Sequence, residues 1–562
     1  MSPIVVDDAA SVNWDRQADV VVVGFGGAGA SAALQAREAG ADVVLVDRFG
    51  GGGTTGYSGG VIYAGATRFQ REAGFADTVD NMLAYLEMEV GDAVRPETLR
   101  RFCEGSAADV DWLIGHGVRY ASDAYLDKIT YPPEGKFLYY SGNEKSPAFA
   151  EKAEPAPRGH RAVGLGFGGA HYIAALRAAI QRNGIALLAH ARATRLVCDR
   201  DGTVLGVEIV QLPEDHQAEQ QRLYEKVSPY VPHNHGRTER ALKRMRELEQ
   251  RHGRTILIRA RGGVILGTGG FAYGRDLIDR HDAAFARHYA VTHRLSTMGN
   301  DGSGLMMGLS VGGATGRMDS LYIARNIAPP EALLEGVMVN RDGERFVAED
   351  AYVSLIGGEV ARQPDGDAWL LVNARCFRRS MREAVTCGWQ RFKYFGVPML
   401  VNYALGGTRR GRTIRTLARR IGVDPARLEA TIRGHDADIA AGRPDAVGKT
   451  EDLRRPVGRG VVYAINMSMS NRHALTKFMT LGGLRVDEES GAVVRGDGSA
   501  IRGLYAAGMA AVGLHSNGYI SGLSIADGVF SGRRAGRDAA AASGPKPVNR
   551  MPQATAETTG AA

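Results

Sequence analysis

Cysteine is scarce and scattered in this sequence. The chain of 562 residues contains 4 cysteines, at positions 103, 198, 376 and 387. No two of them form a Cys-x-x-Cys pair, so we expect neither a disulfide framework nor a zinc site, and we predict no bound metal. Scattered single cysteines fit a reducing compartment, and we predict a cytoplasmic protein.

Long hydrophobic runs are also missing. Residues 1–17 are acidic and lack the basic start and apolar core of a signal peptide. No run approaches the roughly 20 apolar residues that a membrane span needs. A transmembrane segment is therefore not expected, while a peripheral contact with a membrane stays open. Residues 543–562 have the composition of a disordered tail.

The sequence also lacks a strong excess of charge of one sign. The formal net charge of +7 is small for this length, and no dense run of Lys and Arg is interleaved with aromatic residues. We therefore do not expect nucleic-acid binding. Hydrophobic residues make up 44% and charged residues 23%, which is ordinary for a globular protein, and the length allows two or more domains.

Glycine, by contrast, is abundant, at 74 residues. The first cluster, Gly24-x-Gly26-x-x-Gly29, follows an apolar strand and opens an alanine-rich helix, and a second apolar strand then ends on Asp47. This is the complete dinucleotide-binding fingerprint, in which the glycines allow a tight turn and a close approach of the pyrophosphate. Asp47 is expected to accept hydrogen bonds from a ribose. The pattern predicts a site for an ADP moiety.

A second glycine-rich loop follows at once, from Arg48 through Thr54, Thr55 and Ser58 to Gly60. It offers free backbone N–H groups and hydroxyls to a pyrophosphate or to the edge of a flavin. A second cluster here is typical of proteins that hold an extended FAD, so we predict FAD rather than NAD. The loop contains no histidine, and we expect the FAD to be bound non-covalently.

Two later glycine turns are predicted to return to the same cofactor. One ends the strand that leads into Thr268, and the other runs from Gly508 through Tyr519 to a helix predicted over residues 528–541. A helix N-terminus in such a place favours negative charge on a ligand. Asp301 is a candidate N-cap. The complete set of predicted cofactor-binding residues is Gly24, Gly26, Gly27, Ala28, Gly29, Asp47, Arg48, Thr54, Thr55, Ser58, Gly59, Gly60, Ala193, Thr268, Gly269, Gly270, Asp301, Gly508, Met509, Ser524 and Ile525.

Two stretches between these turns have two interpretations each. Residues 120–157 are loop-like and rich in aromatics, including Tyr131 and Tyr139; they either line an apolar pocket or form a surface loop that packs on itself. Residues 211–251 are charged, and their second half is helix-prone. We predict a solvated helical insertion there, with an oligomer or partner contact as the alternative.

Three segments together resemble the fumarate reductase/succinate dehydrogenase flavoprotein superfamily: the fingerprint with its second glycine loop, the strand that ends in Gly-Thr-Gly-Gly-Phe, and residues 505–536. The resemblance implies an α/β fold: a Rossmann-like FAD-binding domain in two sequence segments with an inserted α+β capping (substrate) domain. The expected boundaries are 15–295 for the first FAD segment, with the helical insertion 211–251, then 296–464 for the capping domain, 465–542 for the second FAD segment and 543–562 for the tail.

The groups that bind or protonate a dicarboxylate in that superfamily are replaced here. Met479 stands where the relatives have a histidine, and Tyr519 and Val353 stand where they have arginines. Burying two carboxylates without cationic partners costs several kcal/mol. Chemistry on fumarate or succinate is therefore not expected.

The pattern Tyr519-x-Ser521-Gly522, together with Glu349-Asp-Ala-Tyr352, resembles the FAD-dependent 3-ketosteroid dehydrogenases of the Δ4-(5α) type, and the Δ1 type less well. The resemblance implies α,β-dehydrogenation of a saturated ketone. Tyr519 and the Gly522 N–H would polarise the ketone, and Ser521 or Tyr352 would take the α-proton.

Several alternatives stay open at this stage. Tyr322 competes with Tyr352, and His515 either assists the base or is structural. Δ1-desaturation, dehydrogenation of another cyclic ketone, reduction of an unsaturated acid and a non-enzymatic flavin carrier are the competing functions. The expected partners are an apolar steroid ketone and an unidentified electron acceptor.

Overall fold

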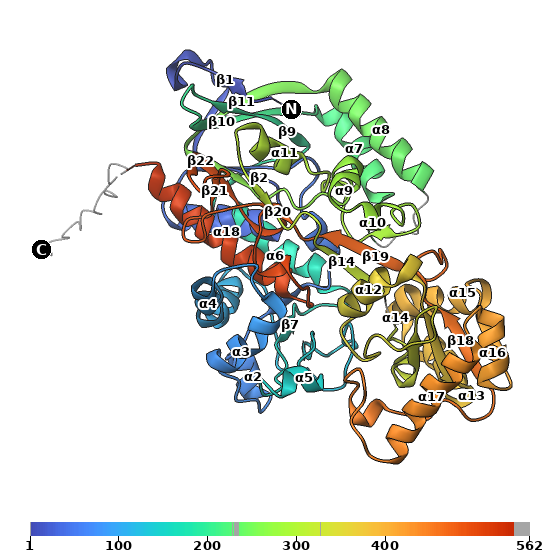
Figure 1. The fold of residues 1–562 in the computed structure, drawn as a ribbon. Coiled ribbons are helices and arrows are strands. Elements are labelled where there is room, and N and C mark those ends of the chain that lie inside the picture. The colour runs from blue at the N-terminus through green and yellow to red at the C-terminus, as the bar shows by residue number, and fades with distance from the viewer. Residues whose placement is uncertain (1, 228, 230–234, 326, 545–562) are drawn as a thin grey trace, which may run out of the picture.

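The structure is a computed structural model that describes residues 2–227, 229, 235–325 and 327–544. A nine-stranded sheet forms the centre of the FAD-binding part (Figure 1), with the strand order β1-β9-β10-β11-β2-β3-β8, and with β22 and then β21 (Ala492–Val494) continuing from β11. The parallel strands are β2 (Arg16–Val23), β3 (Val43–Val46), β8 (Ala186–Leu188), β11 (Arg254–Leu266) and β22 (Ala500–Ala506). Residues 18–23 of β2 are buried, as expected of a parallel strand that is covered on both faces.

The predicted hairpin and the return of the chain to this sheet are both present. β9 (Ala191–Cys198) and β10 (Val204–Gln211) pair antiparallel around the turn at Asp201–Gly202, and β1 (Ile4–Val5) pairs with β9. β11 then lies between β2 and β22, although more than 200 residues separate these strands along the chain. The fingerprint and the C-terminal glycine turn thus end at one edge of one sheet.

Helices α1 (Gly27–Glu38) and α18 (Leu523–Ala542) pack closely together against this sheet. Small residues make the approach possible: a Cβ on Gly532 would lie 2.5 Å from the carbonyl oxygen of Ala28, and one on Gly536 would lie 2.3 Å from that of Ala32. α18 begins at Leu523, five residues before the start that the sequence suggested. Gly528 and Gly532 are poor helix formers alone, but packing against α1 stabilises the helix there.

The insertion is helical, but it is not simply solvated. It forms α7 (Glu214–Glu225) and α8 (His235–His252). Tyr224 stacks on Phe49 with ring centroids 4.3 Å apart, and Met245 is buried in the same cluster. The outer face of the helix pair is largely exposed, as expected, but its inner face covers the second glycine loop. Residues 228 and 230–234 of the insertion lie outside the described residues.

The capping domain contains a four-stranded sheet in the order β15-β16-β18-β17 and a group of helices at its outer side (Figure 1). Its strands are β15 (Val337–Val339), β16 (Trp369–Asn373), β18 (Val462–Asn466) and β17 (Arg409–Gly411). Its helices include α12 (Val353–Arg362), α13 (Ala374–Thr386), α14 (Trp389–Arg391), α15 (Val397–Leu405), α16 (Ile414–Ile421) and α17 (Pro425–Ala440).

Two smaller sheets connect the layers. β12 (His293–Arg294), β19 (Thr476–Thr480) and β14 (Leu321–Arg325) form one of them. The other has the order β4-β7-β6-β5, from β4 (Val61–Tyr63), β7 (Gly159–Arg161), β6 (Leu138–Tyr139) and β5 (Ala124–Tyr125). Helices α3 (Val79–Val90), α4 (Pro96–Gly115) and α6 (Gly168–Arg182) belong to the FAD side. Helix α11 (Ser303–Ser310) also packs against this side, at β9, although it follows the limit that we propose at residue 296. β14 and β19 connect the FAD-binding side to the capping domain. The domain limits at residues 296 and 464 remain our proposal.

Candidate active site

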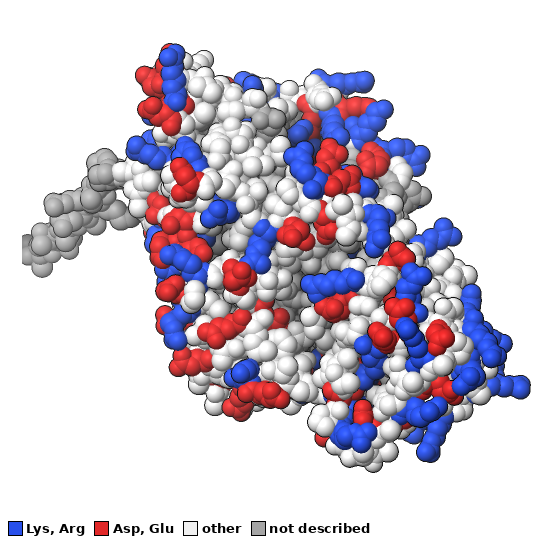
Figure 2. Space-filling model, in the orientation of Figure 1, with Lys and Arg blue, Asp and Glu red and all other residues white. Residues whose placement is uncertain are grey.

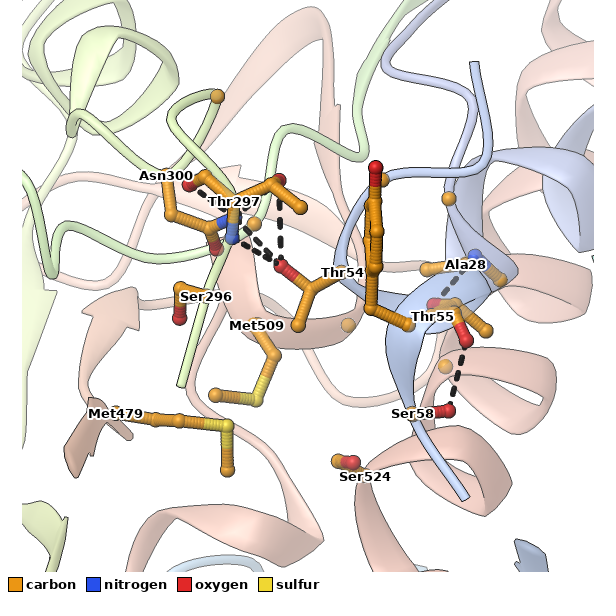
Figure 3. Close-up of a pocket in the computed structure, with 18 of the residues that line it drawn as sticks. Ala28, Thr54, Thr55, Ser58, Ser296, Thr297, Asn300, Met479, Met509 and Ser524 are labelled. Atoms are coloured by element: carbon orange, nitrogen blue, oxygen red, sulfur yellow. Dashed lines mark hydrogen bonds between the residues drawn. The ribbon is translucent and has the colours of Figure 1, made fainter. Parts of the chain in front are cut away.

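A large cavity lies where the two layers meet, between the N-termini of α1 and α18 on one side and the tyrosines of the capping side on the other. Figure 3 shows Thr54, Ser524 and Met509 converging on it from distant segments of the chain. Of the predicted cofactor residues, those that line it are Gly24, Gly26, Gly27, Ala28, Asp47, Arg48, Thr54, Thr55, Ser58, Gly59, Ala193, Thr268, Gly269, Gly508, Met509, Ser524 and Ile525. Tyr352, Tyr519 and Ser521 also line it.

Other predicted residues lie one layer behind the cavity wall. A Cβ on Gly29 would lie 1.8 Å from the carbonyl oxygen of Gly24, and one on Gly60 would lie 2.2 Å from the carbonyl carbon of Gly168. The N–H of Gly270 donates to Asn300 Oδ1 at 2.9 Å. These glycines therefore shape the wall through close backbone packing rather than by facing the cavity.

The N-terminus of α1 is built to receive an anion. The N–H of Gly27 donates to Thr55 Oγ1 at 3.1 Å, and the N–H of Ala30 donates to the carbonyl of Gly26. The N–H groups of Ala28 and Gly29 have no acceptor in the part of the chain that the structure describes. Unsatisfied amides at a helix N-terminus, beside a glycine turn, fit the pyrophosphate of FAD.

Asp47 is held in place by the backbone around it. Its two carboxylate oxygens accept the N–H of Phe25 at 2.7 Å and the N–H of Phe49 at 2.8 Å. Burial raises the pKa of this carboxyl, and the backbone hydrogen bonds oppose that shift. Each oxygen keeps a second lone pair, so the carboxylate can still accept a ribose hydroxyl in the cavity.

Arg48 is committed to carboxylates rather than left free for a phosphate. Its guanidinium contacts Glu249 through two hydrogen bonds of 2.7 and 2.9 Å, and Asp301 at 2.8 Å. Asp301 also accepts the N–H of Ser303 at 3.0 Å, while Gly302 occupies the N-cap of α11. Glu249 belongs to α8 and was not predicted, because nothing near it in sequence points to Arg48. The insertion thus fixes the second glycine loop through Arg48.

Thr54 is the centre of a hydrogen-bond network that joins the glycine loop to residues 297–300 (Figure 3). Its Oγ1 accepts the N–H of Thr297 at 3.0 Å and the side-chain amide of Asn300 at 2.9 Å. Thr297, Asn300 and Ser296 line the cavity and were not predicted individually. The Asn300-Asp-Gly turn was the feature of the sequence that could have indicated these residues.

A group of tyrosines surrounds Ser521 at the capping side of the cavity. Tyr519 Oη lies 3.1 Å from Ser524 Oγ, and its ring packs edge-on against Tyr322 at 4.6 Å. Tyr352 is buried beside both rings. Its burial is the main cause, and the neighbouring tyrosines the second cause, of a pKa well above the usual value. Burial also raises the pKa of Tyr519. Both phenols therefore stay protonated at neutral pH and can donate hydrogen bonds.

Tyr139 is a further member of this group that the sequence did not single out. Its Oη lies 3.0 Å from Ser521 Oγ, and burial raises its pKa. It comes from β6, within the aromatic stretch whose role stayed open. Tyr131, from the same stretch, lines the cavity. The pocket-lining interpretation of residues 120–157 is therefore correct for part of that stretch.

The first turn of α18 faces the part of the cavity that Ser521 and the tyrosines line. Gly522 adopts a φ of 98° at its N-cap, and its carbonyl accepts the N–H of Tyr63 at 3.2 Å. The N–H groups of Ser524 and Ile525 have no acceptor among the residues described. A positive helix end beside Ser521 and Tyr519 favours negative charge on a bound flavin or on a substrate oxygen.

His515 lies away from this chemistry. It is fully buried, and its Nδ1 is hydrogen-bonded to the carboxylate of Asp527 in α18. It does not line the cavity. We therefore interpret His515 as a structural group that ties the loop before Tyr519 to α18.

A buried carboxyl supports the tyrosine group from behind. Glu89 Oε1 accepts the hydroxyl of Tyr85 at 2.7 Å and the side-chain amide of Asn143 at 2.8 Å. Asn143 Oδ1 in turn accepts the N–H of Tyr352 at 2.7 Å. The pKa of Glu89 is raised from 4.5 to about 7, and burial is the main cause.

Replacing Glu89 by Gln is expected to flatten the pH dependence of stability. The folded protein retains a proton on Glu89 up to about pH 7, whereas the unfolded chain loses it near 4.5. The folded state therefore binds more protons in this window, and stability contributed by Glu89 falls as pH rises through it. Thermal unfolding followed between about pH 5 and pH 8 should show a smaller decrease in Glu89→Gln than in the wild type. The surface change Glu104→Gln is the control, and an equal decrease in all proteins would contradict the assignment.

Comparison with known proteins agrees with this geometry. Residues 19–525 match the family model described as FAD binding domain, so the chain belongs to that family of flavoproteins. Within it, the chain belongs with the 3-ketosteroid dehydrogenases. It is 35% identical to a 3-oxo-5-alpha-steroid 4-dehydrogenase of Comamonas testosteroni over 510 residues, which cover 90% of this chain and 94% of the relative.

Solved structures extend the comparison to the fold. The 3-ketosteroid-Δ4-(5α)-dehydrogenase of Rhodococcus jostii RHA1, in complex with 4-androstene-3,17-dione, has a TM-score of 0.80 and 28% identity, over 96% of this chain and 100% of that one. The 3-ketosteroid Δ1-dehydrogenase of Sterolibacterium denitrificans has a TM-score of 0.65 and 18% identity, over 94% and 100%, and is similar in fold alone. No helix among residues 2–227, 235–325 and 327–544 is long and apolar enough to cross a membrane.

Proposed function

We propose that this flavoenzyme introduces the C4–C5 double bond into a saturated 5α-3-ketosteroid. The observation that carries the proposal is the convergence of Tyr519, Ser521 and Tyr352 on the cavity beside the N-terminus of α18. The relatives of this chain that share most of its length include steroid dehydrogenases of this kind. An apolar cavity with a few convergent hydroxyls suits a ketone on a hydrocarbon skeleton.

Tyr519 and the backbone of Gly522 hold the ketone oxygen in this proposal. A C–H bond next to a ketone becomes acidic enough to break when the developing enolate oxygen receives hydrogen bonds. Tyr519 is protonated at neutral pH and partly buried, so its hydroxyl can turn from Ser524 to the substrate oxygen. The positive end of α18 adds to the stabilisation of negative charge there.

Ser521 takes the proton from C4. A serine has no basicity of its own at neutral pH, so Ser521 must give its hydroxyl proton to the oxygen of Tyr139 as it accepts the proton from C4, and Tyr139 must release its own phenolic proton towards water. Tyr139 lies within hydrogen-bond distance behind it, and Tyr352 stands beside it in the cavity wall. FAD, when bound, supplies the acceptor for the hydride that leaves C5.

Replacing Tyr139 by Phe is expected to slow proton removal without releasing FAD. The ring would remain in the core, while Ser521 Oγ would lose its hydrogen bond to Tyr139 Oη. We expect kcat to fall about tenfold, with KM changed less than twofold, because a group that assists proton transfer contributes on the order of 10²–10⁴ and Tyr139 acts through Ser521. The pH profile of kcat should shift as well. An unchanged kcat and pH profile would remove Tyr139 from the proposed proton path.

Reduction of an unsaturated acid is the second candidate, and one observation favours it. Lys477 lines the cavity, and burial lowers its pKa to about 8. The other described cations of the lining, Arg48 and Arg192, both contact Glu249. Lys477 alone does not replace the missing arginines, and we expect the steroid reaction instead.

Two anaerobic mixing experiments separate these functions. The oxidised yellow protein mixed with saturated 3-ketosteroids should lose its flavin absorbance, and the reduced protein mixed with fumarate or urocanate should stay bleached. The opposite pair of results would support the acid reductase, and no response to any cyclic ketone would support a flavin carrier without this activity. The substrate is an apolar small molecule in our proposal, the electron acceptor is a separate molecule, and the free cysteines support a cytoplasmic location.

A further inference from the structure

The capping domain carries an exposed apolar surface on α13, α14 and α15. Within α13 and within α15 the exposed side chains are spaced four residues apart, which places them on one face of each helix. They are Met381 and Val385 on α13, Trp389 at the start of α14, and Val397, Val401 and Leu405 on α15. Trp389 is 76% exposed and Leu405 is 64% exposed. We call these six residues the apolar face.

The same helices bury polar groups on their inner side. Asn402 is buried next to the exposed Val401 and accepts the side-chain amide of Asn471 at 2.8 Å. Ser380 is buried next to the exposed Met381 and accepts the hydroxyl of Tyr403 at 2.8 Å. Helices of a protein that meets only water show the reverse arrangement. An apolar outer face on such helices marks a surface that contacts something other than water.

Positive charge flanks the apolar face on α13. Arg378 and Arg382 lie three residues before Met381 and Val385, so they flank the stripe on α13, and both are exposed. Neither makes an ion pair with any residue that the structure describes, whereas Arg379 on the same helix pairs with Glu335 and Glu383. Figure 2 shows Lys and Arg side chains gathered along the outer edge of the capping domain, where Figure 1 places α16. The charge complements an anionic partner.

The apolar face is continuous with the active-site cavity. Residues 392–396 join α14 to α15, and Phe395 of this segment lines the cavity. The neighbouring Tyr394 contacts Phe167, another lining residue, with ring centroids 5.0 Å apart. Leu165, two residues before Phe167, is 84% exposed. Phe395 also lines a second, smaller cavity under α15. One layer of aromatic side chains therefore separates the apolar face from the substrate site.

We propose that the apolar face docks on an anionic phospholipid bilayer, and that the substrate enters the cavity from the lipid past Phe395. Apolar side chains that enter the headgroup region, flanked by Arg and Lys, give reversible binding that depends on anionic lipid. A ketone with a large hydrocarbon skeleton concentrates in a bilayer for the same reason that it fits the cavity. The entry route rests on the proposed function, whereas the docking itself does not.

The first test is sedimentation of the FAD-loaded protein with vesicles. Binding to vesicles of phosphatidylcholine with phosphatidylglycerol should exceed binding to phosphatidylcholine alone by at least about tenfold, and should weaken as salt is added. The double variant Val385→Glu/Trp389→Glu should lose this binding by a similar factor. Val5→Glu is the matched control, since Val5 is 59% exposed and Val385 is 55% exposed. Absence of wild-type binding, or equal binding by the double variant, would overturn the proposal.

The second test separates docking from catalysis. With the steroid dissolved in cyclodextrin, the double variant should turn over at the wild-type rate and keep its FAD, because none of the replaced residues lines the cavity. With the steroid delivered in anionic vesicles, its rate should be about tenfold lower. Equal rates in vesicles would overturn the entry route. If the wild-type protein were a dimer that does not bind vesicles and the double variant were a monomer, a second copy of the chain would cover the face, and the proposal would be wrong. Failure of the proposed function would appear differently, as no turnover in either medium.

Discussion

Replacing Tyr519 by Phe should lower the rate at which a saturated 3-ketosteroid bleaches the flavin by about 10²–10³-fold, the usual cost of one lost hydrogen-bond donor to an enolate-like oxygen. The ring would keep its contact with Tyr322 at 4.6 Å, so FAD content and thermal stability should change little. Ser521→Ala should lower the same rate by a similar factor through the lost proton transfer. Stopped-flow absorbance under anaerobic conditions measures both.

The matched control for this pair is Tyr505→Phe. Tyr505 donates its hydroxyl to Asp538 at 2.9 Å on the far part of α18 and does not line the cavity. Its bleaching rate should equal that of the wild type. If Tyr519→Phe and Ser521→Ala both remained within about threefold of the wild type, the assignment of these groups to the ketone and to the proton would be wrong.

Replacing Gly29 by Ala should produce a protein without FAD. A Cβ at this position would lie 1.8 Å from the carbonyl oxygen of Gly24, so either the turn or the start of α1 must move. Such a shift misplaces the free N–H groups of Ala28 and Gly29, which we assign to the pyrophosphate. We expect less than a tenth of the wild-type flavin to remain after gel filtration, measured by absorbance.

Gly105→Ala is the control for this substitution. A Cβ on Gly105 would meet nothing within 4 Å, and the residue lies inside α4. The variant should be as yellow as the wild type and slightly more stable, because Ala is the better helix former. A Gly29→Ala protein that retained its flavin would show that the start of α1 does not bind the phosphates as proposed.

The sequence predicted the cofactor half of the site well because that half is local. The glycine turn, its flanking strands and Asp47 lie within 30 residues, and each has a separate physical reason for its place. The start of α18 was misplaced because the glycines at both ends of residues 522–528 suggest a loop. Packing against α1, which only the fold shows, makes them helical.

The remaining partners were hidden because they come from distant segments. Tyr139 contacts Ser521 although they are 382 residues apart in the sequence, and Glu249 contacts Arg48 although they are 201 residues apart. No local pattern marks either one, since a buried tyrosine in an aromatic stretch and a glutamate in a charged helix are common. Tyr352 was indicated only by its Glu-Asp-x-Tyr context, and its contact with the tyrosine group depends on how α12 packs against β14.

The most direct test of the account is the deuterium isotope effect on flavin bleaching. A 5α-3-ketosteroid that carries deuterium at C5 should bleach the wild-type flavin several times more slowly than the unlabelled compound, and deuterium at C1 should have no effect. The product should then contain the C4–C5 double bond. An isotope effect from C1 with none from C5 would assign the enzyme to Δ1-desaturation and contradict the proposed function.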